Sequence, residues 1–205
     1  NSTIRYDVDF EKYLIPVEYK AKGTGYVQPY ADSPLDFEIT GENVYMNMIN
    51  SARNYLYIMT PYLIITDEMA RSISLAAQRG VDVRIITPGI PDKKLVYKIT
   101  RSYYSELVRN GVRIFEYTPG FTHGKMCIAD DELATVGTIN FDYRSFYHHF
   151  ENGCLLYKCH AITDIKNDFN ETFEKCEEVT ELYKKTSRRA LKASECIFRF
   201  FAPLL

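Results

Sequence analysis

One stretch of the chain concentrates side chains that transfer protons or bind anions. In order, they are His123, Lys125, Asp130, Gly137, Thr138 and Asn140. Written as a pattern, the stretch reads H-x-K-x4-D-x6-G-[ST]-x-N. A lone His-x-Lys pair is usually surface decoration, but so many specified residue types at fixed spacing rarely coincide by chance. The stretch therefore predicts a site for a phosphodiester, whose charged oxygens need cationic and hydrogen-bonding partners.

Phosphodiester cleavage poses two problems, because negative oxygens shield the phosphorus and an alkoxide is a poor leaving group. We expect Lys125, Thr138 and Asn140 to hold the non-bridging oxygens, and one such preorganised donor stabilises a transition state by about 3–4 kcal/mol. The imidazole of His123 can attack phosphorus when it is neutral, or protonate the leaving oxygen when it is charged. It can fill only one of these roles at a time.

In-line displacement places the nucleophile and the leaving group on opposite sides of phosphorus, so the chemistry requires two histidines. His148, His149 and His160 lack a lysine two positions later, and we expect them to be ordinary. The second catalytic histidine must then come from another lobe. That lobe is either a second copy of the chain or a further part of the same polypeptide.

Two carboxylates belong to the candidate catalytic set, and each has an alternative role. Asp130 can act in the chemistry, or it can simply hold the following turn together. Glu151 can be a surface charge, or it can accept the Nδ1 proton of His123 and fix the imidazole tautomer.

Strand geometry would bring the motif residues onto one face. On a strand, His123 and Lys125 point the same way because side chains alternate. A two-residue turn at 131–132 would set the register of an antiparallel pair. That register places Lys125 opposite Thr138, and it places His123 opposite Asn140. Directly opposite residues share a face, so the four side chains would converge.

The elements before the motif alternate between strands and helices. β-Branched and aromatic runs predict strands at 55–59, 81–86 and 112–117. The expected helices run from about 42 to 53, from Asp67 as N-cap to Gly80, and from beyond Asp92 to Gly111. A Thr-Pro pair follows each strand, and parallel strands end on one edge, where ligand crevices form. This rhythm predicts an α/β fold with a mixed sheet flanked by helices on both faces.

The segments on either side complete the domain. Residues 1–25 read as a linker or inter-lobe segment, and 26–205 as the domain that carries the motif. A further strand is expected at 149–158. A long helix is expected at 161–192, because apolar residues recur at helical spacing and acidic residues precede basic ones.

Composition narrows the classes of partner. The chain has 205 residues, 46% of them hydrophobic, and a net charge of -2. That balance suits one sizeable core and gives no support for a nucleic-acid partner.

Five cysteines without C-x2-C pairing favour reduced thiols over disulfides, and neither a metal nor a cofactor is expected. We find no apolar run of membrane-spanning length and no secretory leader. The first residue, Asn1, suggests a processed product or part of something longer.

The chain resembles bacterial cardiolipin synthases of the phospholipase D superfamily, in particular their C-terminal lobe. The resemblance covers Tyr26 to Leu205. It rests on the motif itself, on the Asn-Phe-Asp-Tyr-Arg-Ser-Phe run at 140–146 and on the closing Ala-Pro-Leu-Leu at 202–205.

The resemblance implies a two-lobed enzyme whose lobes share one site and form a covalent phosphohistidine intermediate. Phosphatidylglycerol would donate a phosphatidyl group to a second phosphatidylglycerol, without a metal, at the cytoplasmic face of the bacterial membrane. It also implies that His123 acts as acid and base, that Lys125, Thr138 and Asn140 bind phosphate, and that Glu151 orients the histidine. Alone, the chain would be soluble or peripheral, with weak or no activity unless two copies pair.

Two rival functions remain open from the residues. One is a homodimeric phosphodiesterase or nuclease of the same superfamily, and the other is a non-catalytic module that binds phosphate or a lipid head group. The apolar tail at 196–205 can contact an anionic membrane surface, or it can pack on its own domain.

Overall fold

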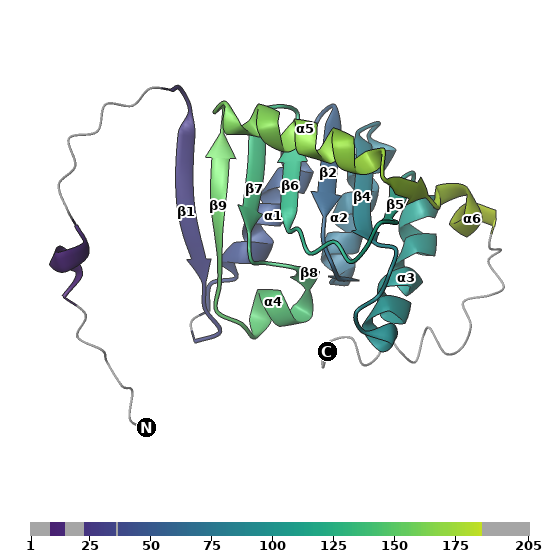
Figure 1. Ribbon diagram of the computed structural model, residues 1–205, viewed down its shortest axis with the longest axis horizontal. Helices are drawn as coiled ribbons and strands as arrows, with labels where there is room; N and C mark the ends of the chain where they lie inside the picture. Colours follow the sequence, from purple (N-terminus) through teal and green to yellow (C-terminus); the bar gives the residue numbers. More distant parts are fainter. Residues whose placement is uncertain (1–8, 15–22, 36, 186–205) are drawn as a thin grey trace.

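The structure is a computed structural model that describes residues 9–14, 23–35 and 37–185. Eight strands form one sheet in the order β1-β9-β7-β6-β2-β4-β5-β10 (Figure 1). The strands are β1 (Tyr26–Asp32), β2 (Tyr55–Met59), β4 (Asp82–Pro88), β5 (Arg113–Tyr117), β6 (Met126–Ala129), β7 (Leu133–Gly137), β9 (Glu151–Tyr157) and β10 (Cys176–Glu178). β2, β4 and β5 are mutually parallel, whereas every other pairing in this sheet is antiparallel. Two short parallel strands, β3 (Leu63–Ile64) and β8 (Phe141–Asp142), form a separate pair.

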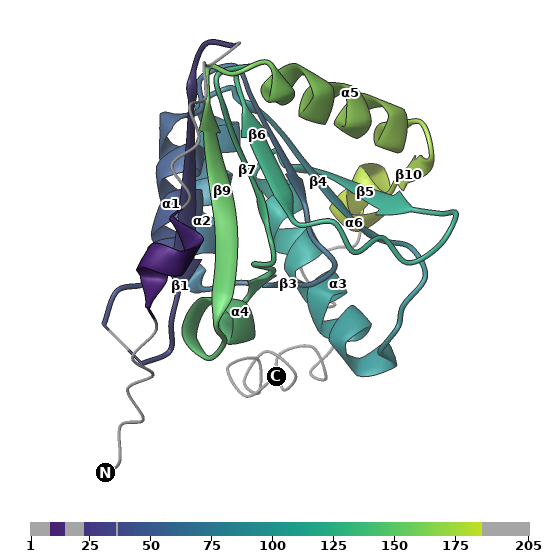
Figure 2. The same cartoon turned by 60° about the vertical axis from the view of Figure 1, so that its left-hand side comes forward.

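Helices cover both faces of the large sheet. The helices of the described residues are η1 (Phe10–Tyr13), α1 (Thr40–Ser51), α2 (Asp67–Gln78), α3 (Lys94–Arg109), α4 (Tyr143–Tyr147), α5 (Ala161–Phe173) and α6 (Thr180–Lys185). Helix α5 crosses one face, and α1 and α2 lie on the other (Figures 1 and 2). The expected α/β fold, with a mixed sheet between helices, is therefore confirmed.

The alternation of side chains along β2 explains why the molecule has two cores. All five residues of β2 are buried. Leu56 and Ile58 join the core beneath α1, α2 and α3. Tyr55, Tyr57 and Met59 join the core beneath α5. A central strand that is buried on both faces must be apolar throughout, which is why this run lacks the polar alternation of a half-exposed strand.

Most predicted elements lie where the sequence placed them. The strands expected at 55–59, 81–86 and 112–117 correspond to β2, β4 and β5. Gly80 and Gly111 end α2 and α3 with φ angles of 94° and 99°, a region that L side chains rarely adopt. The N-cap of α2 is Thr66 rather than Asp67, because the Thr66 side chain accepts a hydrogen bond from the Met69 amide at 3.2 Å.

The long helix expected at 161–192 is wrong. Helix α5 ends at Phe173, and the chain then forms β10 and the short helix α6. β10 pairs with β5 and satisfies backbone groups at that edge of the sheet; the Val179 amide, for example, donates to the Ile114 carbonyl at 3.0 Å. The end of the predicted helix, together with the tail at 196–205, lies outside the described residues.

The predicted edge of Thr-Pro pairs exists, but all three threonine hydroxyls serve the fold; that of Thr118 donates to the Lys175 carbonyl at 2.9 Å. The Thr60 hydroxyl donates to the Tyr62 carbonyl at 2.7 Å and accepts from the Phe141 amide at 3.1 Å. The Thr87 hydroxyl is hydrogen-bonded to Tyr104 at 2.5 Å. These pairs therefore tie the strand ends to neighbouring segments. Within the described ranges, no helix is long and apolar enough to cross a bilayer.

Candidate active site

The His123–Lys125 segment crosses the carboxyl end of β2. It lies just before β6 rather than within a strand, although the Gly137 amide still donates to the Lys125 carbonyl at 3.2 Å. A Cβ atom on Gly124 would lie 2.5 Å from the Met59 sulfur. The motif therefore sits at the edge where the parallel strands end, as the sequence predicts for a ligand site.

Lys125 is a buried cation. Its exposed fraction is 9%, and Nζ donates to the His123 carbonyl at 2.7 Å. Burial lowers the pKa of Lys125, while the carboxylates of Glu151 and Asp142 raise it in part. An ammonium has three donors, and the His123 carbonyl occupies one of them. The remaining donors suit an anionic oxygen.

His123 is exposed and is biased toward its neutral form. Burial lowers the pKa of His123, the charge of Lys125 lowers it further, and Asp92 opposes both effects. The ring lies 5.7 Å from that of Phe121, which lies 6.3 Å from Tyr62. A neutral, accessible imidazole can attack phosphorus or accept a proton.

Glu151 and Thr138 contact each other directly. The Thr138 hydroxyl donates to Glu151 Oε2, and it accepts from the Asn152 amide at 3.0 Å. Glu151 Oε1 lies 3.5 Å from His149 Nδ1. Among the residues described here, Glu151 is thus hydrogen-bonded to Thr138 and lies close to the His149 ring. The interpretation that Glu151 accepts the His123 Nδ1 proton stays a prediction.

A neighbouring carboxylate holds the side chain of Asn140. Its side chain hydrogen-bonds the buried Asp142 carboxylate, so its NH2 group is the donor there. Its Oδ1 atom is buried and has no partner in the described part of the chain. Burial raises the pKa of Asp142, whose carboxylate also accepts from the Ser145 amide at 2.7 Å. An amide NH2 group has two hydrogens and Asp142 takes one of them, so the role of Asn140 in binding phosphate stays a prediction.

The close approach of β9 explains why the motif has a glycine at position 137. A Cβ atom at this position would clash with the Asn152 carbonyl and with Gly153 on β9. Only glycine lets β7 approach β9 this closely. That approach brings Thr138 within reach of Glu151.

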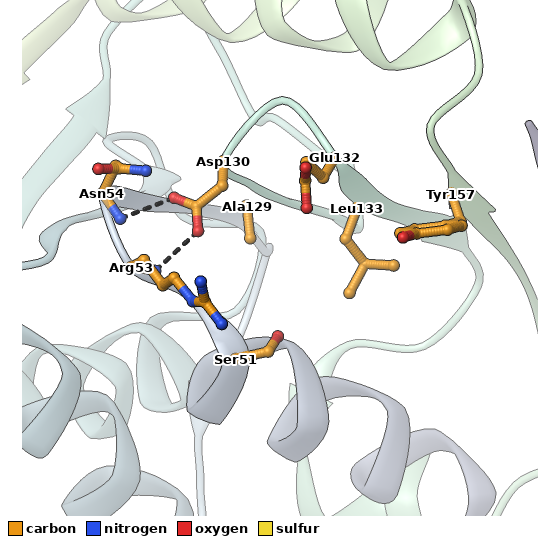
Figure 3. A pocket seen from close by; sticks show the side chains of 8 residues that line it. All are labelled: Ser51, Arg53, Asn54, Ala129, Asp130, Glu132, Leu133 and Tyr157. Atoms are coloured by element: carbon orange, nitrogen blue, oxygen red, sulfur yellow. Dashed lines mark hydrogen bonds between the residues drawn. The ribbon is translucent and has the colours of Figure 1, made fainter.

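Asp130 lies at the other end of β6, away from His123. Its carboxylate accepts three backbone amides, from Arg53 at 2.7 Å, Asn54 at 2.8 Å and Tyr55 at 2.9 Å. Figure 3 shows two of these bonds. The structure separates Asp130 from the other candidate residues. Of its two possible roles, the geometry supports holding the chain together, here at the start of β2.

The hairpin register differs from the predicted one. Ala129 pairs with Leu133, so the connection has three residues rather than two. Asp130 and Asp131 have φ angles of 55° and 58°, which aspartate tolerates better than most residues. This shift places Lys125 next to Gly137 rather than opposite Thr138.

Sequence reasoning missed a group of polar residues beside the motif. They line a pocket together with Asn140 and comprise Tyr62, Lys93, Asp142, Arg144 and His149. His149 carries no lysine two positions later, but it lies two residues before Glu151, and that spacing could have revealed it. In the described ranges, no cluster of three or more His, Cys, Asp or Glu side chains could hold a metal ion.

Comparisons with known proteins identify the family of this chain. A family model described as "Cardiolipin synthase, PLD-like domain" matches residues 45–173. The cardiolipin synthase of Alkalihalophilus pseudofirmus is 35% identical over 95% of this chain and 39% of its own length. An uncharacterized protein of Streptococcus mutans is 48% identical over 100% of this chain and 44% of its own. The chain thus spans less than half the length of these curated relatives.

Solved structures share the fold at low sequence identity. Nuc from Salmonella typhimurium, a phospholipase D family member, has a TM-score of 0.64 at 16% identity, over 76% of this chain and 98% of its own. The phosphatidylserine synthase of Haemophilus influenzae has a TM-score of 0.63 at 17% identity, over 87% of this chain and 45% of its own. With the family match over most of its length, this chain belongs to the cardiolipin synthase family of phospholipase D-like domains.

Proposed function

We propose that this chain supplies one half of a phosphatidyl-transfer site of the cardiolipin synthase type. The site would move a phosphatidyl group from one phosphatidylglycerol to the hydroxyl of a second, releasing glycerol. The observation that carries the proposal is a buried lysine joined to an exposed histidine. Lys125 is buried, and its Nζ atom donates to the carbonyl of the exposed His123. A buried ammonium with unused donors attracts an anionic oxygen, and the imidazole then lies beside the reacting phosphorus.

We assign proton transfer to His123 and nucleophilic attack to a histidine of the opposing lobe. The opposing imidazole forms a bond to phosphorus while the bond to the glycerol oxygen breaks, and His123 gives that oxygen a proton. In the second step, His123 takes the proton of the acceptor hydroxyl. The acceptor oxygen then bonds to phosphorus and the opposing imidazole leaves, which yields cardiolipin and restores both histidines.

The remaining motif residues would act on charge and position. Lys125 stabilises the negative oxygens of the five-coordinate transition state. Glu151 positions Thr138 and His149. The lowered pKa of His123 favours the second step, because a neutral imidazole is the form that accepts a proton.

The opposing lobe is a required partner in this proposal. In-line displacement needs a histidine on the far side of phosphorus, and the relatives' additional length is large enough for another domain. A second copy of this chain is the alternative source. Both lipids reside in a bilayer, so the working site would lie at its surface, which we place on the cytoplasmic side.

The test uses the full-length protein with vesicles that contain head-group-labelled phosphatidylglycerol. We expect glycerol release and cardiolipin formation, and a loss of at least about 10³-fold in His123→Asn, because the acid and base is removed. A His160→Asn variant, altered at an exposed histidine outside the site, is the matched control. Activity of His123→Asn near that of the control would refute the proposal. Phosphatidic acid as the sole product would instead favour a phosphodiesterase.

A further inference from the structure

The three Thr-Pro pairs of the sequence lead to one connected group of side chains. The pairs lie at the ends of the parallel strands β2, β4 and β5. Soon after each pair comes one member of the group, namely Tyr62 after β2, Asp92 after β4 and Phe121 after β5. We call these three residues the exit group. Because parallel strands end at one edge of a sheet, the exit group lies at the same edge as His123.

Ring contacts and one hydrogen bond connect the exit group to His123. The Tyr62 hydroxyl donates to Asp92 Oδ2 at 2.5 Å. The centroid of the Tyr62 ring lies 6.3 Å from that of Phe121. The Phe121 centroid lies 5.7 Å from that of the His123 imidazole, with 34° between the two ring planes. Both separations are within the roughly 4.5–7 Å over which aromatic rings attract each other.

The far end of the exit group is fixed by hydrogen bonds. Asp92 is exposed, yet its Oδ1 atom accepts the Lys93 amide at 2.6 Å while Oδ2 accepts Tyr62. Burial and the Asp92 carboxylate raise the pKa of Tyr62, so the hydroxyl keeps its proton and remains a donor. Tyr62 therefore has a defined position from which its ring can support Phe121.

The imidazole of His123 has few other contacts that could orient it. Within the described ranges, the ring makes no hydrogen bond, and Phe121 is its one aromatic neighbour. An exposed ring without a hydrogen bond can turn about its side-chain torsions. In-line transfer is sensitive to such motion, because a misplacement of about 1 Å can cost about 10²-fold in rate. The contact with Phe121 restricts this motion.

The exit group also sets part of the charge around His123. Burial lowers the pKa of His123, the Lys125 ammonium lowers it further, and the Asp92 carboxylate at the start of α3 raises it. Lys93 adds a positive charge next to Asp92, with its Nζ atom 6.0 Å from the centroid of the Tyr62 ring. Asp92 therefore favours the protonated imidazole, which is the form that donates to a leaving oxygen.

We propose that Phe121, Tyr62 and Asp92 are positioning residues for His123. Phe121 sets the direction of the imidazole, Tyr62 supports Phe121, and Asp92 holds Tyr62. This inference rests on the proposed function and explains how an exposed histidine keeps the alignment that in-line transfer requires. The three residues act through His123 rather than on the substrate.

The first test replaces Phe121 in the full-length protein and measures turnover of phosphatidylglycerol in vesicles. Phe121→Leu removes the ring and should lower kcat by about 10-fold while KM changes by less than about twofold, because substrate binding does not use this ring. Phe121→Tyr keeps the ring and should stay within about twofold of the wild type. Tyr26→Leu, which removes an exposed ring on β1, is the control. A wild-type kcat in Phe121→Leu would overturn the proposal.

The second test asks whether Tyr62 and Asp92 act as a pair. Tyr62→Phe and Asp92→Ala each remove the same hydrogen bond, and each should lower kcat by about fivefold. The double variant should be no slower than the slower single variant, because residues that share one interaction are not additive. Losses that multiply in the double variant would overturn the link between Tyr62 and Asp92.

The third test observes His123 without turnover, by NMR of protein labelled with 13C in its histidines. Phe121→Leu should shift the imidazole resonance, because the ring current of Phe121 is lost. Asp92→Ala should lower the pKa of His123, because a negative charge is removed. Residues that only stabilise the fold would change neither value, so an unchanged resonance and an unchanged pKa overturn the proposal. If both change in a protein that consumes no phosphatidylglycerol, the proposed function fails while the positioning of His123 stands.

Discussion

The polar groups at the two ends of β6 differ in how fully they are hydrogen-bonded. At the hairpin end, formed by residues 130–132, both carboxylate oxygens of Asp130 accept backbone amides. At the site end, formed by residues 123–126, Lys125 donates to one carbonyl and remains buried. The neighbouring Asn140 oxygen has no partner in the described structure. The four residues of β6 thus separate an end whose polar groups have hydrogen-bond partners from an end where some of them lack partners.

This contrast divides the motif into a structural part, at the hairpin end, and a proposed catalytic part, at the site end. Native proteins pair almost all buried polar groups with protein or ordered water, so an unpaired one points to a bound water, a ligand or strain. The hairpin end stabilises the fold because its groups satisfy one another. Under the proposed function, the site end carries an energetic cost in the free protein because its groups are arranged for a substrate. The predictions below test this division, beginning with the largest expected effect.

Replacing Lys125 tests the site end. Lys125→Met should lower kcat by about 10²–10³-fold, because it removes one preorganised donor to the transition state. The free energy of unfolding should equal or exceed that of the wild type, because the variant no longer buries a charge. Steady-state kinetics and chemical denaturation measure the two effects. A variant that loses stability while keeping its activity would reverse the assignment.

Replacing Asp130 tests the hairpin end. Asp130→Ala should lower the free energy of unfolding by about 2–4 kcal/mol, because three amides lose a charged acceptor and two of them are exposed enough to bond water. Activity per folded molecule should persist. Glu132→Ala is the control, since its ion pair with Lys158 is exposed to solvent and contributes little to stability. Equal stability of the two variants would show that the amides do not need Asp130.

The pH dependence of His123 probes the charge at the site end. Its pKa should lie below the ordinary value of about 6.5, and it should rise in Lys125→Met because the neighbouring positive charge is gone. Proton NMR titration of the imidazole measures both. Since the folded protein favours the neutral ring, the stability contributed by this residue should decline as the pH falls through 6.5. An unchanged pKa in Lys125→Met would mean that the two groups do not interact.

Asp142→Asn gives the smallest expected effect. Asparagine can still accept from the Ser145 amide and cap α4, but it removes a carboxylate whose pKa is raised by burial. When folding raises the pKa of an acid, the protein loses stability as the pH rises from the unfolded-state pKa, about 3.9 for aspartate, to the folded-state pKa. The wild type should therefore lose stability relative to the variant over that range, as measured by denaturation from pH 4 to 7. A relative gain with rising pH would contradict the buried-carboxylate assignment.

Local patterns determined much of this protein. The apolar runs of β2, β4 and β5 and the glycines that end α2 and α3 follow from strand burial and backbone conformation, which depend on neighbouring residues. The motif spacing predicted His123 and Lys125 as site residues, because a His-x-Lys pair rarely precedes an Asp, Gly, Thr and Asn at these fixed distances by chance. These features could be predicted without knowing what packs against them.

The tertiary structure decided what depended on distant partners. Residues 176–178 carry a helical pattern but form β10, because the edge of β5 offers unpaired backbone groups. Asp130 became a structural residue because the start of β2 brings three amides to it. The basic pocket beside Asn140 assembles from β3, α3 and α4, segments that no local spacing connects. The hydrogen-bond partners that a residue finds in the fold, rather than its type, therefore distinguish the structural residues from the proposed site residues.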